Sequence, residues 1–479
     1  MTRGPVFSDD LSQLRHRCNA IPRKGIVLVI FPGEGLAMRF NRIGISLGAL
    51  LLVPIFSWAA CIGSSPNWSS TPDYNSVDRC VRSARLGDRI NVSAGSATWS
   101  GTLSLNKPVQ LIGAGVGNTI ISGSKLITIN SPANTALLRI SGFTFIVGSS
   151  GGPIVGCTNG RRYPPSHMIR IDHNKFTCSG TCTTGHCGMI NEGCRGVVDN
   201  NIFEKMDYPL GVGDGDFPGN WDWNHYPDLI YGAANDNLYV EDNTFANLTR
   251  CLTDCDTGGR YAIRYNTIIP GAEMYPVLDT HNGLGTVHGC MGVEVYGNYI
   301  VNGGTAEWTD YRGGRLLTFY NFCAGNCYSK VSNNEGCPPQ PISRQNINTA
   351  YFWANRDKHG TMSLAQGSDA CPAHPLVENS SYWKDNFNCI APKTCADIAV
   401  GVGCGTLANR PANCTTGTGY WATNQSCSDF TGMVGVNPKT PISGTLYKCT
   451  STNTWTAFYT PYTYPHPLRK IIQLKANQK

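Results

Sequence analysis

Ile169-Arg-Ile-Asp-His-Asn174-Lys-Phe176 is the clearest copy of an eight-residue pattern that recurs along the chain. Other clear copies carry asparagine at the same position, and looser copies follow; the asparagines are Asn201, Asn243, Asn266, Asn298, Asn321 and Asn355. The segment Leu138-Arg-Ile-Ser-Gly-Phe143-Thr-Phe145 has the same frame, with phenylalanine in place of asparagine. The chain is therefore built from repeats of one local structure.

Each clear copy has two apolar positions, one three residues before the asparagine and one two residues after it. Side chains alternate between the faces of a strand, so this odd separation predicts a bend near the asparagine, which tolerates bends. We expect both apolar sets inside: Ile171, Val198, Val240, Ile263 and Val295, then Phe176, Phe203, Phe245, Ile268 and Ile300. The position two before the asparagine should face solvent: Asp172, Asp199, Glu241, Arg264 and Tyr296.

The spacings between asparagines from Asn174 to Asn321 are 27, 42, 23, 32 and 23 residues. A minimum in the low twenties with variable excess is typical of a solenoid with loop insertions. Successive coils would stack like residues at the strand separation of about 4.8 Å, so the asparagine amides can bond in a ladder. An antiparallel β-sandwich also alternates, but it does not require asparagine at the same place in every repeat.

The Asn-x-Phe copies resemble the coils of the right-handed parallel β-helix in the pectate-lyase-like superfamily. The segments 87–99, 109–115 and 119–123 look like its first coils, and the resemblance covers roughly residues 75–360. It implies an all-β fold, a right-handed parallel β-helix solenoid with an N-terminal capping helix and a small disulfide-rich C-terminal region. It says little about activity, because the superfamily contains lyases, hydrolases, epimerases and non-catalytic surface proteins.

The chain divides into four parts. Residues 1–37 read as a disordered extension or a misplaced start, and residues 38–60 as a signal peptide with a basic start, a short apolar middle and small residues at its end. An N-terminal membrane anchor is the alternative. Residues 61–370 would form the β-helix, and residues 371–479 a cysteine-rich cap. We expect a monomer that is secreted or periplasmic and has no membrane span once the leader is removed.

Cysteine usage agrees with that compartment, because 20 of the 21 cysteines follow the leader. We expect disulfides between the coils. Zinc is the alternative for the spacings Cys178-x3-Cys182-x4-Cys187 and Cys323-x3-Cys327. Lipidation of Cys61 is a further alternative, which would leave an odd number of cysteines.

A short amphipathic helix is predicted over Ser76–Arg85, with Ser76 as its cap. Its apolar residues are Val77, Cys80, Val81 and Ala84. The first coil of a solenoid exposes apolar core and an unpaired strand edge, so this helix should cover both.

The net charge is +6 for the whole chain, and loss of residues 1–60 removes seven basic and three acidic side chains, leaving about +2. This balance excludes a nucleic-acid-binding footprint. It is compatible with a polysaccharide partner bound in a locally basic groove.

The densest polar cluster predicts an active site. We expect Arg260, Arg264, Asp279, His281 and Arg312 to line one exposed groove, and Glu294 is a further catalytic candidate. β-Elimination on an acidic glycan requires a cation near the uronate carboxylate and a base near its C5 proton; Arg264 would be the base or the clamp, with His281 taking the proton.

Glycoside hydrolysis is the alternative chemistry, with two carboxylates roughly 5–10 Å apart. Asp254, Asp256, Asp279 and Glu294 are the candidates, since stacked coils place like positions at such distances. A non-catalytic protein that binds glycans at the cell surface is the third possibility. A polysaccharide lyase is the leading expectation.

The loop Gly211–Tyr226 carries further candidates. Trp221, Trp223 and Tyr226 could stack on sugar rings, and Asp214, Asp216 and Asp222 could hold Ca²⁺. The alternative is a loop that packs on itself.

Overall fold

The computed structural model describes residues 61–130, 134–148, 154–157, 167–180, 188–192, 194–213, 237–256, 258–271, 277–282, 289–301, 305–333, 346–347, 349–369, 371–385 and 400–470. The predicted extension and signal peptide lie outside these ranges. Among the described helices, none has the length and hydropathy needed to cross a bilayer.

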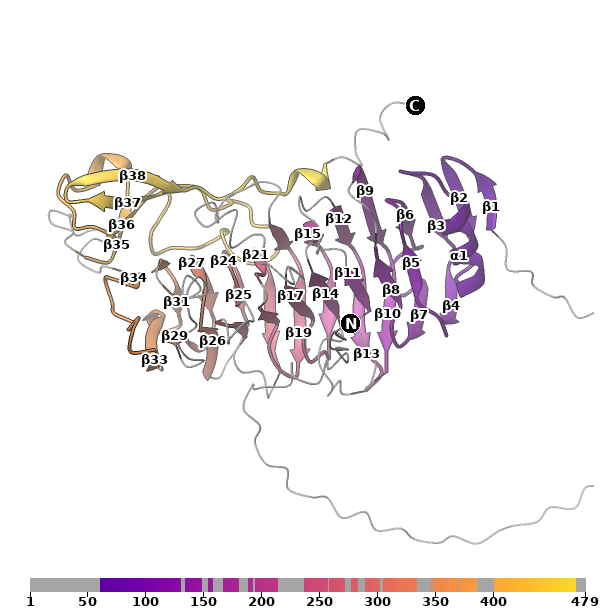
Figure 1. Ribbon diagram of the computed structural model, residues 1–479, viewed down its shortest axis with the longest axis horizontal. Coiled ribbons are helices and arrows are strands. Elements are labelled where there is room, and N and C mark those ends of the chain that lie inside the picture. Colours follow the sequence, from indigo (N-terminus) through magenta and orange to yellow (C-terminus); the bar gives the residue numbers. More distant parts are fainter. Residues whose placement is uncertain are drawn as a thin grey trace, which may run out of the picture. The chain divides into compact units, whose positions relative to one another are not determined.

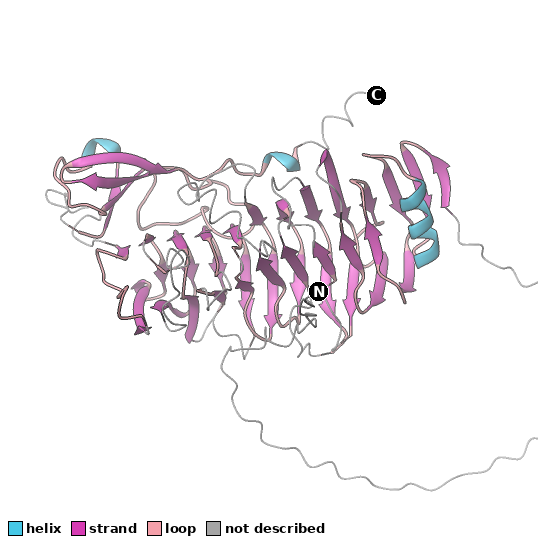
Figure 2. Ribbon diagram, viewed as in Figure 1, coloured by secondary structure: helices cyan, strands magenta, loops and turns pink. Residues whose placement is uncertain are grey.

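Three long sheets make up the first part of the structure (Figures 1 and 2). Sheet A contains β1 (Cys61–Ser64), β2 (Asn67–Ser70), β3 (Arg89–Val92), β6 (Gln110–Ile112), β9 (Asn134–Ser141), β12 (His167–Asp172), β15 (Arg195–Asp199), β18 (Leu238–Glu241), β21 (Arg260–Arg264), β24 (Gly292–Tyr296), β27 (Arg315–Phe319), β30 (Ala350–Trp353) and β34 (Tyr382–Lys384). Sheet B contains β4 (Gly95–Thr98), β7 (Thr119–Gly123), β10 (Thr144–Val147), β13 (Lys175–Cys178), β16 (Ile202–Glu204), β19 (Thr244–Leu248), β22 (Thr267–Pro270), β25 (Tyr299–Ile300), β28 (Phe322–Cys323), β31 (Arg356–Asp357) and β32 (Gly360–Thr361). Sheet C contains β5 (Leu103–Leu105), β8 (Ile127–Ile129), β11 (Val155–Cys157), β14 (Met189–Glu192), β17 (Leu210–Gly213), β20 (Thr253–Cys255), β23 (Leu278–Thr280), β26 (Thr305–Tyr311), β29 (Asn326–Asn333) and β33 (Ser363–Asp369).

The chain visits sheets A, B and C in turn, so each coil adds one strand to each sheet. The coil of β18, β19 and β20 is followed by that of β21, β22 and β23, and the pairs β18–β21, β19–β22 and β20–β23 are all parallel. Within the described parts of the three sheets, only β1–β2 and β31–β32 pair antiparallel. The predicted fold class, a right-handed parallel β-helix, is confirmed. Sheet A continues past residue 370, because β34 pairs with β30.

The asparagine column lies inside the solenoid, where strands of sheet A turn into strands of sheet B. Each Nδ2 donates to Oδ1 of the asparagine in the next coil, over 3.1 Å from Asn174 to Asn201 and 2.9 Å from Asn321 to Asn355. The same oxygens accept backbone N–H groups of the preceding coil, as Asn243 Oδ1 does from Asn201 N. The predicted ladder is confirmed, and it runs through Asn174, Asn201, Asn243, Asn266, Asn298, Asn321 and Asn355.

The predicted bend falls on the residue before each asparagine. These residues all have a left-handed backbone with φ between 51° and 67°: His173, Asn200, Asp242, Tyr265, Gly297, Tyr320 and Ala354. Six of the seven are not glycine, so this conformation is costly and must be held by its surroundings. The ladder contributes to that support, since Asn243 Nδ2 also donates to the Glu241 carbonyl across the turn.

The apolar column beside the ladder is also confirmed. The rings of Phe145, Phe176, Phe203 and Phe245 stack with centroid separations of 5.5, 4.8 and 4.9 Å. Ile268 and Ile300 continue the column in register with Phe245. All of these side chains are buried in one continuous core.

Helix α1 (Tyr74–Ser83) covers the first coil. The predicted bounds Ser76–Arg85 and the predicted cap Ser76 are wrong: the Asp73 carboxylate caps the helix by accepting from Ser76 N at 2.9 Å. Aspartate is a favoured N-cap residue, because its carboxylate can accept the N–H of the residue three positions later. The predicted apolar face is correct, because Val77, Cys80, Val81 and Ala84 all lie in the core.

The described residues contain six complete disulfides: Cys61–Cys80, Cys157–Cys194, Cys255–Cys290, Cys323–Cys327, Cys404–Cys427 and Cys414–Cys449. Cys178 and Cys371 are disulfide-bonded as well. The zinc alternative is therefore wrong for Cys323 and Cys327, and Cys178 is not a free ligand. Cys251 is buried.

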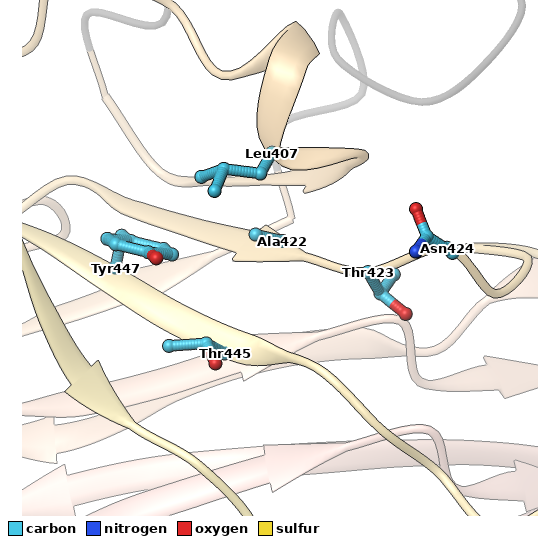
Figure 3. A pocket seen from close by; sticks show the side chains of 6 residues that line it. All are labelled: Leu407, Ala422, Thr423, Asn424, Thr445 and Tyr447. Atoms are coloured by element: carbon cyan, nitrogen blue, oxygen red, sulfur yellow. The ribbon is translucent and has the colours of Figure 1, made fainter.

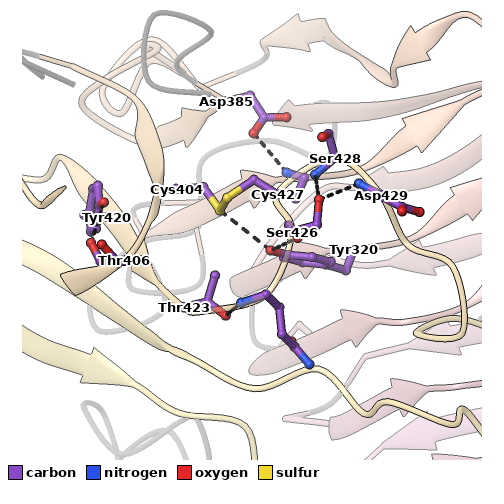
Figure 4. The surroundings of a disulfide bond; sticks show 12 residues. Tyr320, Asp385, Cys404, Thr406, Tyr420, Thr423, Ser426, Cys427, Ser428 and Asp429 are labelled. Carbon is purple, nitrogen blue, oxygen red and sulfur yellow. Dashed lines mark hydrogen bonds between the residues drawn. A yellow bond between two sulfur atoms is a disulfide. The ribbon is translucent and has the colours of Figure 1, made fainter. Parts of the chain in front are cut away.

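A fourth, four-stranded sheet follows the solenoid, with β35 (Val402–Gly405), β36 (Gly419–Ala422), β37 (Thr445–Ser451), β38 (Thr454–Tyr459) and the 3-10 turns η4 (Leu407–Asn409) and η5 (Pro467–Arg469). Its inner face packs Trp421 and Leu446 against Phe319 and Trp353 of sheet A. Near Cys404–Cys427, the Tyr320 hydroxyl lies 3.6 Å from Cys404 Sγ and donates to the Ser426 carbonyl at 2.9 Å (Figure 4). This sheet is thereby fixed to the last coils.

The segment after β38 covers the outer face of sheet A, so one prediction about that face is wrong. Asp172, Asp199, Glu241, Arg264 and Tyr296 point outward, but they are buried rather than solvated. Arg469 forms ion pairs with Asp199 at 3.3 Å, with Glu241 at 2.9 Å and with Asp242. These acidic side chains can be buried because each pairs with an arginine of sheet A or of the covering segment.

Asn243→Ala is expected to lower the free energy of unfolding by about 3 kcal/mol, because Asn243 Nδ2 and Oδ1 serve buried partners in three coils and removal leaves those groups unpaired. Urea unfolding followed by circular dichroism measures the change. Asn106→Ala, on an exposed asparagine that accepts one bond from Ser104, is the control and should change it by less than about 0.5 kcal/mol. Equal effects of the two substitutions would contradict a stabilising ladder.

Candidate active site

A row of three aspartates crosses the outer face of sheet C. Asp254 in β20, Asp279 in β23 and Asp310 in β26 occupy the same register on neighbouring parallel strands. Each follows a buried residue that points into the solenoid, so alternation turns the carboxylate outward. Neighbouring strands lie about 4.8 Å apart, which places the first and third aspartate about twice as far from one another.

His281 and Arg312 lie beside this row, because each follows directly after the end of its strand. Arg312 binds Asp279 with both arms of its guanidinium, Nε to Oδ1 at 3.0 Å and Nη2 to Oδ2 at 2.6 Å. His281 Nε2 lies 2.8 Å from Arg312 Nη2 and 3.0 Å from Asp254 Oδ1. This nitrogen can accept from Arg312 when unprotonated or donate to Asp254 when protonated. A proton on it therefore decides which neighbour it binds.

Asp279 is the most deeply buried of the three aspartates, with 5% of its side chain exposed against 23% for Asp254. Burial raises the pKa of Asp279 to about 6, and the Asp254 carboxylate raises it further, while Arg312 and His281 act in the opposite direction. The proton is thus retained at mildly acidic pH. A carboxyl group in this state can act as a general acid beside ionised carboxylates.

The third aspartate has cationic and hydroxyl partners of its own. Lys330 Nζ lies 3.1 Å from Asp310 Oδ2, and the Ser332 hydroxyl donates to Asp310 Oδ1 at 3.3 Å. Asp310 was not among the predicted site residues. Its alignment with Asp279 was the missing signal, since both occupy the outward position of a sheet C strand.

Asp279, His281 and Arg312 lie together, as predicted. The prediction that Arg264 lies with them in an exposed groove is wrong. Arg264 is fully buried on sheet A, where it binds Glu241 at 2.6 Å and donates to the carbonyls of Tyr462 and Thr463. Glu294 lies on the same covered face and accepts from the Tyr459 hydroxyl at 2.7 Å. Both point out from sheet A, which the C-terminal segment covers, whereas the aspartate row lies on sheet C.

Arg260 and Asp256 lie near the connection from sheet C to sheet A. Arg260 is the first residue of β21 and is buried. Asp256 directly follows β20 and forms a β-bridge with Gly289.

The predicted aromatic and calcium-binding residues lie outside the described residues: Trp221, Trp223, Tyr226, Asp214, Asp216 and Asp222. The chain enters that loop directly from β17, the strand next to β20. Within the described residues, Asp254, Asp279 and His281 form a group with ligand atoms within 4.8 Å of one another. Arg312 already binds both oxygens of Asp279. Ca²⁺ stays a prediction.

No protein-family model matches the sequence, and no curated protein does. Among solved structures, the fold is similar to the catalytic unit of a thermostable GH87 α-1,3-glucanase from Streptomyces thermodiastaticus strain HF3-3. The match has 11% sequence identity, covers 68% of each chain and has a TM-score of 0.30. At these values the likeness carries no argument about chemistry, and membership of the pectate-lyase-like superfamily stays a prediction.

Proposed function

We propose that this protein is a glycoside hydrolase that cleaves a polysaccharide at the aspartate row of sheet C. The observation that carries the proposal is the pair Asp254 and Asp279, on adjacent strands with unequal burial. Glycosidases need one carboxyl group that holds a proton and one that is ionised, roughly 5–10 Å apart. Adjacent and alternate strands of sheet C supply both ends of that range.

In this mechanism Asp279 donates its proton to the glycosidic oxygen as the bond to the sugar breaks. Arg312 then holds the resulting Asp279 carboxylate through its two bonds. Asp254, one strand away, attacks the sugar carbon as a nucleophile and holds the sugar covalently. A water molecule then releases the sugar from Asp254, and the Asp279 carboxylate takes the proton of that water, so the site returns to its starting state. His281 orients Asp254, and the neighbouring Asp310, paired with Lys330, lies beside the two reacting carboxyl groups.

A polymer is the favoured substrate because the row crosses the middle of a long, regular sheet. Sheet C continues for five strands on one side of Asp254 and for two strands beyond Asp310. The surface therefore offers room for sugar units on both sides of the cleaved bond. We also place the enzyme in an oxidising compartment outside the cytoplasm, which the six disulfides support.

A lyase was the leading expectation from the sequence, and it loses its main support because Arg264 is buried. His281 beside Arg312 still offers a base next to a cation, so elimination remains the second candidate. Incubation with acidic and neutral polysaccharides separates the possibilities by two readouts, new reducing ends and ultraviolet absorbance of unsaturated products. Reducing ends alone support hydrolysis, both signals mean elimination, and neither signal with any polymer would refute enzymatic cleavage.

The pH dependence should follow the Asp279 proton. Its pKa is about 6, and a general acid works only when protonated. We therefore expect kcat/KM to fall about tenfold per pH unit above pH 6. Initial rates between about pH 4 and 8 measure this profile. A rate that increases through pH 6 would contradict Asp279 as the acid and favour a base of similar pKa.

A further inference from the structure

The outer face of the C-terminal sheet carries a hollow far in sequence from the aspartate row. Side chains alternate along β36 and β37, so Trp421 and Leu446 point toward the solenoid while Tyr420, Ala422 and Tyr447 point away from it. Six residues line a depression of about 150 Å³ on this outer side: Leu407, Ala422, Thr423, Asn424, Thr445 and Tyr447 (Figure 3).

The lining combines apolar walls with polar rims and contains no charged side chain. Ala422 lies between Tyr447 at one end and Asn424 at the other, with Leu407 on the facing η4 turn (Figure 3). Leu407 is 51% exposed, so its apolar side chain is accessible to a ligand. Cavities of about 150 Å³ accommodate one six-membered ring. The hydroxyls of Thr423 and Thr445 are bonded within the protein. The Tyr447 hydroxyl and the Asn424 amide beside apolar walls fit a molecule whose faces are apolar and whose edges are polar.

Tyr447 is held in place at this hollow. Its ring lies 4.4 Å from the Arg410 guanidinium, which also lies 5.6 Å from the Trp455 ring. Trp455 Nε1 in turn donates to the Pro411 carbonyl at 2.8 Å. The ring is therefore ordered before any ligand arrives. Within the described part of the chain, the Tyr447 hydroxyl and the Asn424 amide have no hydrogen-bond partner, so both are available to a ligand.

We propose that this hollow binds one uncharged pyranose unit of a glycan. Tyr447 and Leu407 would contact the apolar faces of the ring, and Asn424 with the Tyr447 hydroxyl would bond its hydroxyl groups. The hollow is distinct from the aspartate row, since it lies on the C-terminal sheet and contains no group able to break a glycosidic bond. If the proposed hydrolase activity is correct, a second sugar site on the same molecule keeps the enzyme on its polymer between cleavages.

Affinity electrophoresis of the full chain in gels containing a soluble neutral glucan tests the proposal. The experiment uses Asp279→Asn protein as the parent, so that the polymer is not cut during the run. A panel of neutral glucans, mannans and xylans is compared with an anionic galacturonan. Tyr447→Ala and Asn424→Ala should each weaken retardation by at least about tenfold for the polymer that retards the parent.

Matched substitutions in the same C-terminal part separate binding from folding. Val436→Ala replaces an exposed apolar residue outside the hollow and is compared with Leu407→Ala; Asn413→Ala is the counterpart of Asn424→Ala. We expect the two controls to bind as the parent does, with equal melting temperatures for all exposed-site variants. Equal retardation of hollow variants and controls, retardation only by the anionic polymer, or no retardation of the parent by any neutral glycan would overturn the proposal.

Cleavage of a short soluble oligosaccharide by otherwise unmodified Tyr447→Ala protein should match the unmodified enzyme. Since binding is measured without turnover, failure of the hydrolase proposal would leave this result interpretable.

Discussion

Asp279→Asn is expected to lower kcat on the cleaved polysaccharide by at least about 100-fold, because the amide cannot supply the proton that the leaving oxygen needs. Asparagine keeps the size and one acceptor oxygen of the side chain, so Arg312 retains part of its contact. The pH profile of the residual activity should also lose its fall above pH 6. Reducing-end assays at saturating polymer measure kcat, and initial rates measure the profile.

A buried ion pair is lost together with the acid, so the result needs a control for folding. Asp172→Asn is the match, since Asp172 is buried on the outer side of sheet A and is held by two arms of Arg139 in the same way. Both substitutions should lower stability, whereas only Asp279→Asn should lower activity per folded molecule. Equal activity losses would mean that Asp279 acts through the fold and is not the proton donor.

The fold could be predicted from the sequence because each coil repeats the same local pattern of residues. An inward aliphatic residue, a turn and an inward phenylalanine or isoleucine recur at each coil, and the asparagine at the turn bonds its counterparts above and below. The position of the left-handed residue was less accessible. Histidine, aspartate, tyrosine and alanine all occupy it, so no residue type marks the bend.

The site was predicted only in part, for a physical reason. Stacked coils made Asp254 and Asp279 two of four candidate carboxylates, but the asparagine repeats did not identify which of the four pair; the structure aligns these two on adjacent strands. The covering of a sheet by a distant segment cannot be read from periodicity. Glu241 and Arg264 form part of an outward charged column, and nothing local to them indicates that Tyr462, Thr463 and Arg469 lie over it. An outward charge was therefore interpreted as an exposed one.

The covered face also explains why the aspartate row is the better place for chemistry. On sheet A, burial raises the pKa of Glu241, but two arginines and a backbone N–H lower it by more. Its pKa therefore lies below the ordinary value. On sheet C, Asp279 has one arginine and an acidic neighbour, and its pKa rises to about 6. The first arrangement fixes a charge permanently, whereas the second leaves a proton that can move near neutral pH.

Arg264→Met is expected to lower the free energy of unfolding by about 3–5 kcal/mol while leaving the activity per folded molecule unchanged. Methionine fills similar space but removes donors to Glu241, to the Tyr296 hydroxyl and to the carbonyls of Tyr462 and Thr463. The guanidinium also lies 4.6 Å from the Tyr239 ring, and that contact is lost too. The C-terminal segment should become the first part to open, so limited proteolysis near Tyr462 should accelerate before the solenoid unfolds.

Arg82→Met is the control, because Arg82 pairs with Asp78 on the surface of α1, where an ion pair contributes less than about 1 kcal/mol. A variant that keeps its stability but loses activity would return Arg264 to the catalytic site; a variant that is destabilised yet active per folded molecule assigns it to the attachment of the C-terminal segment.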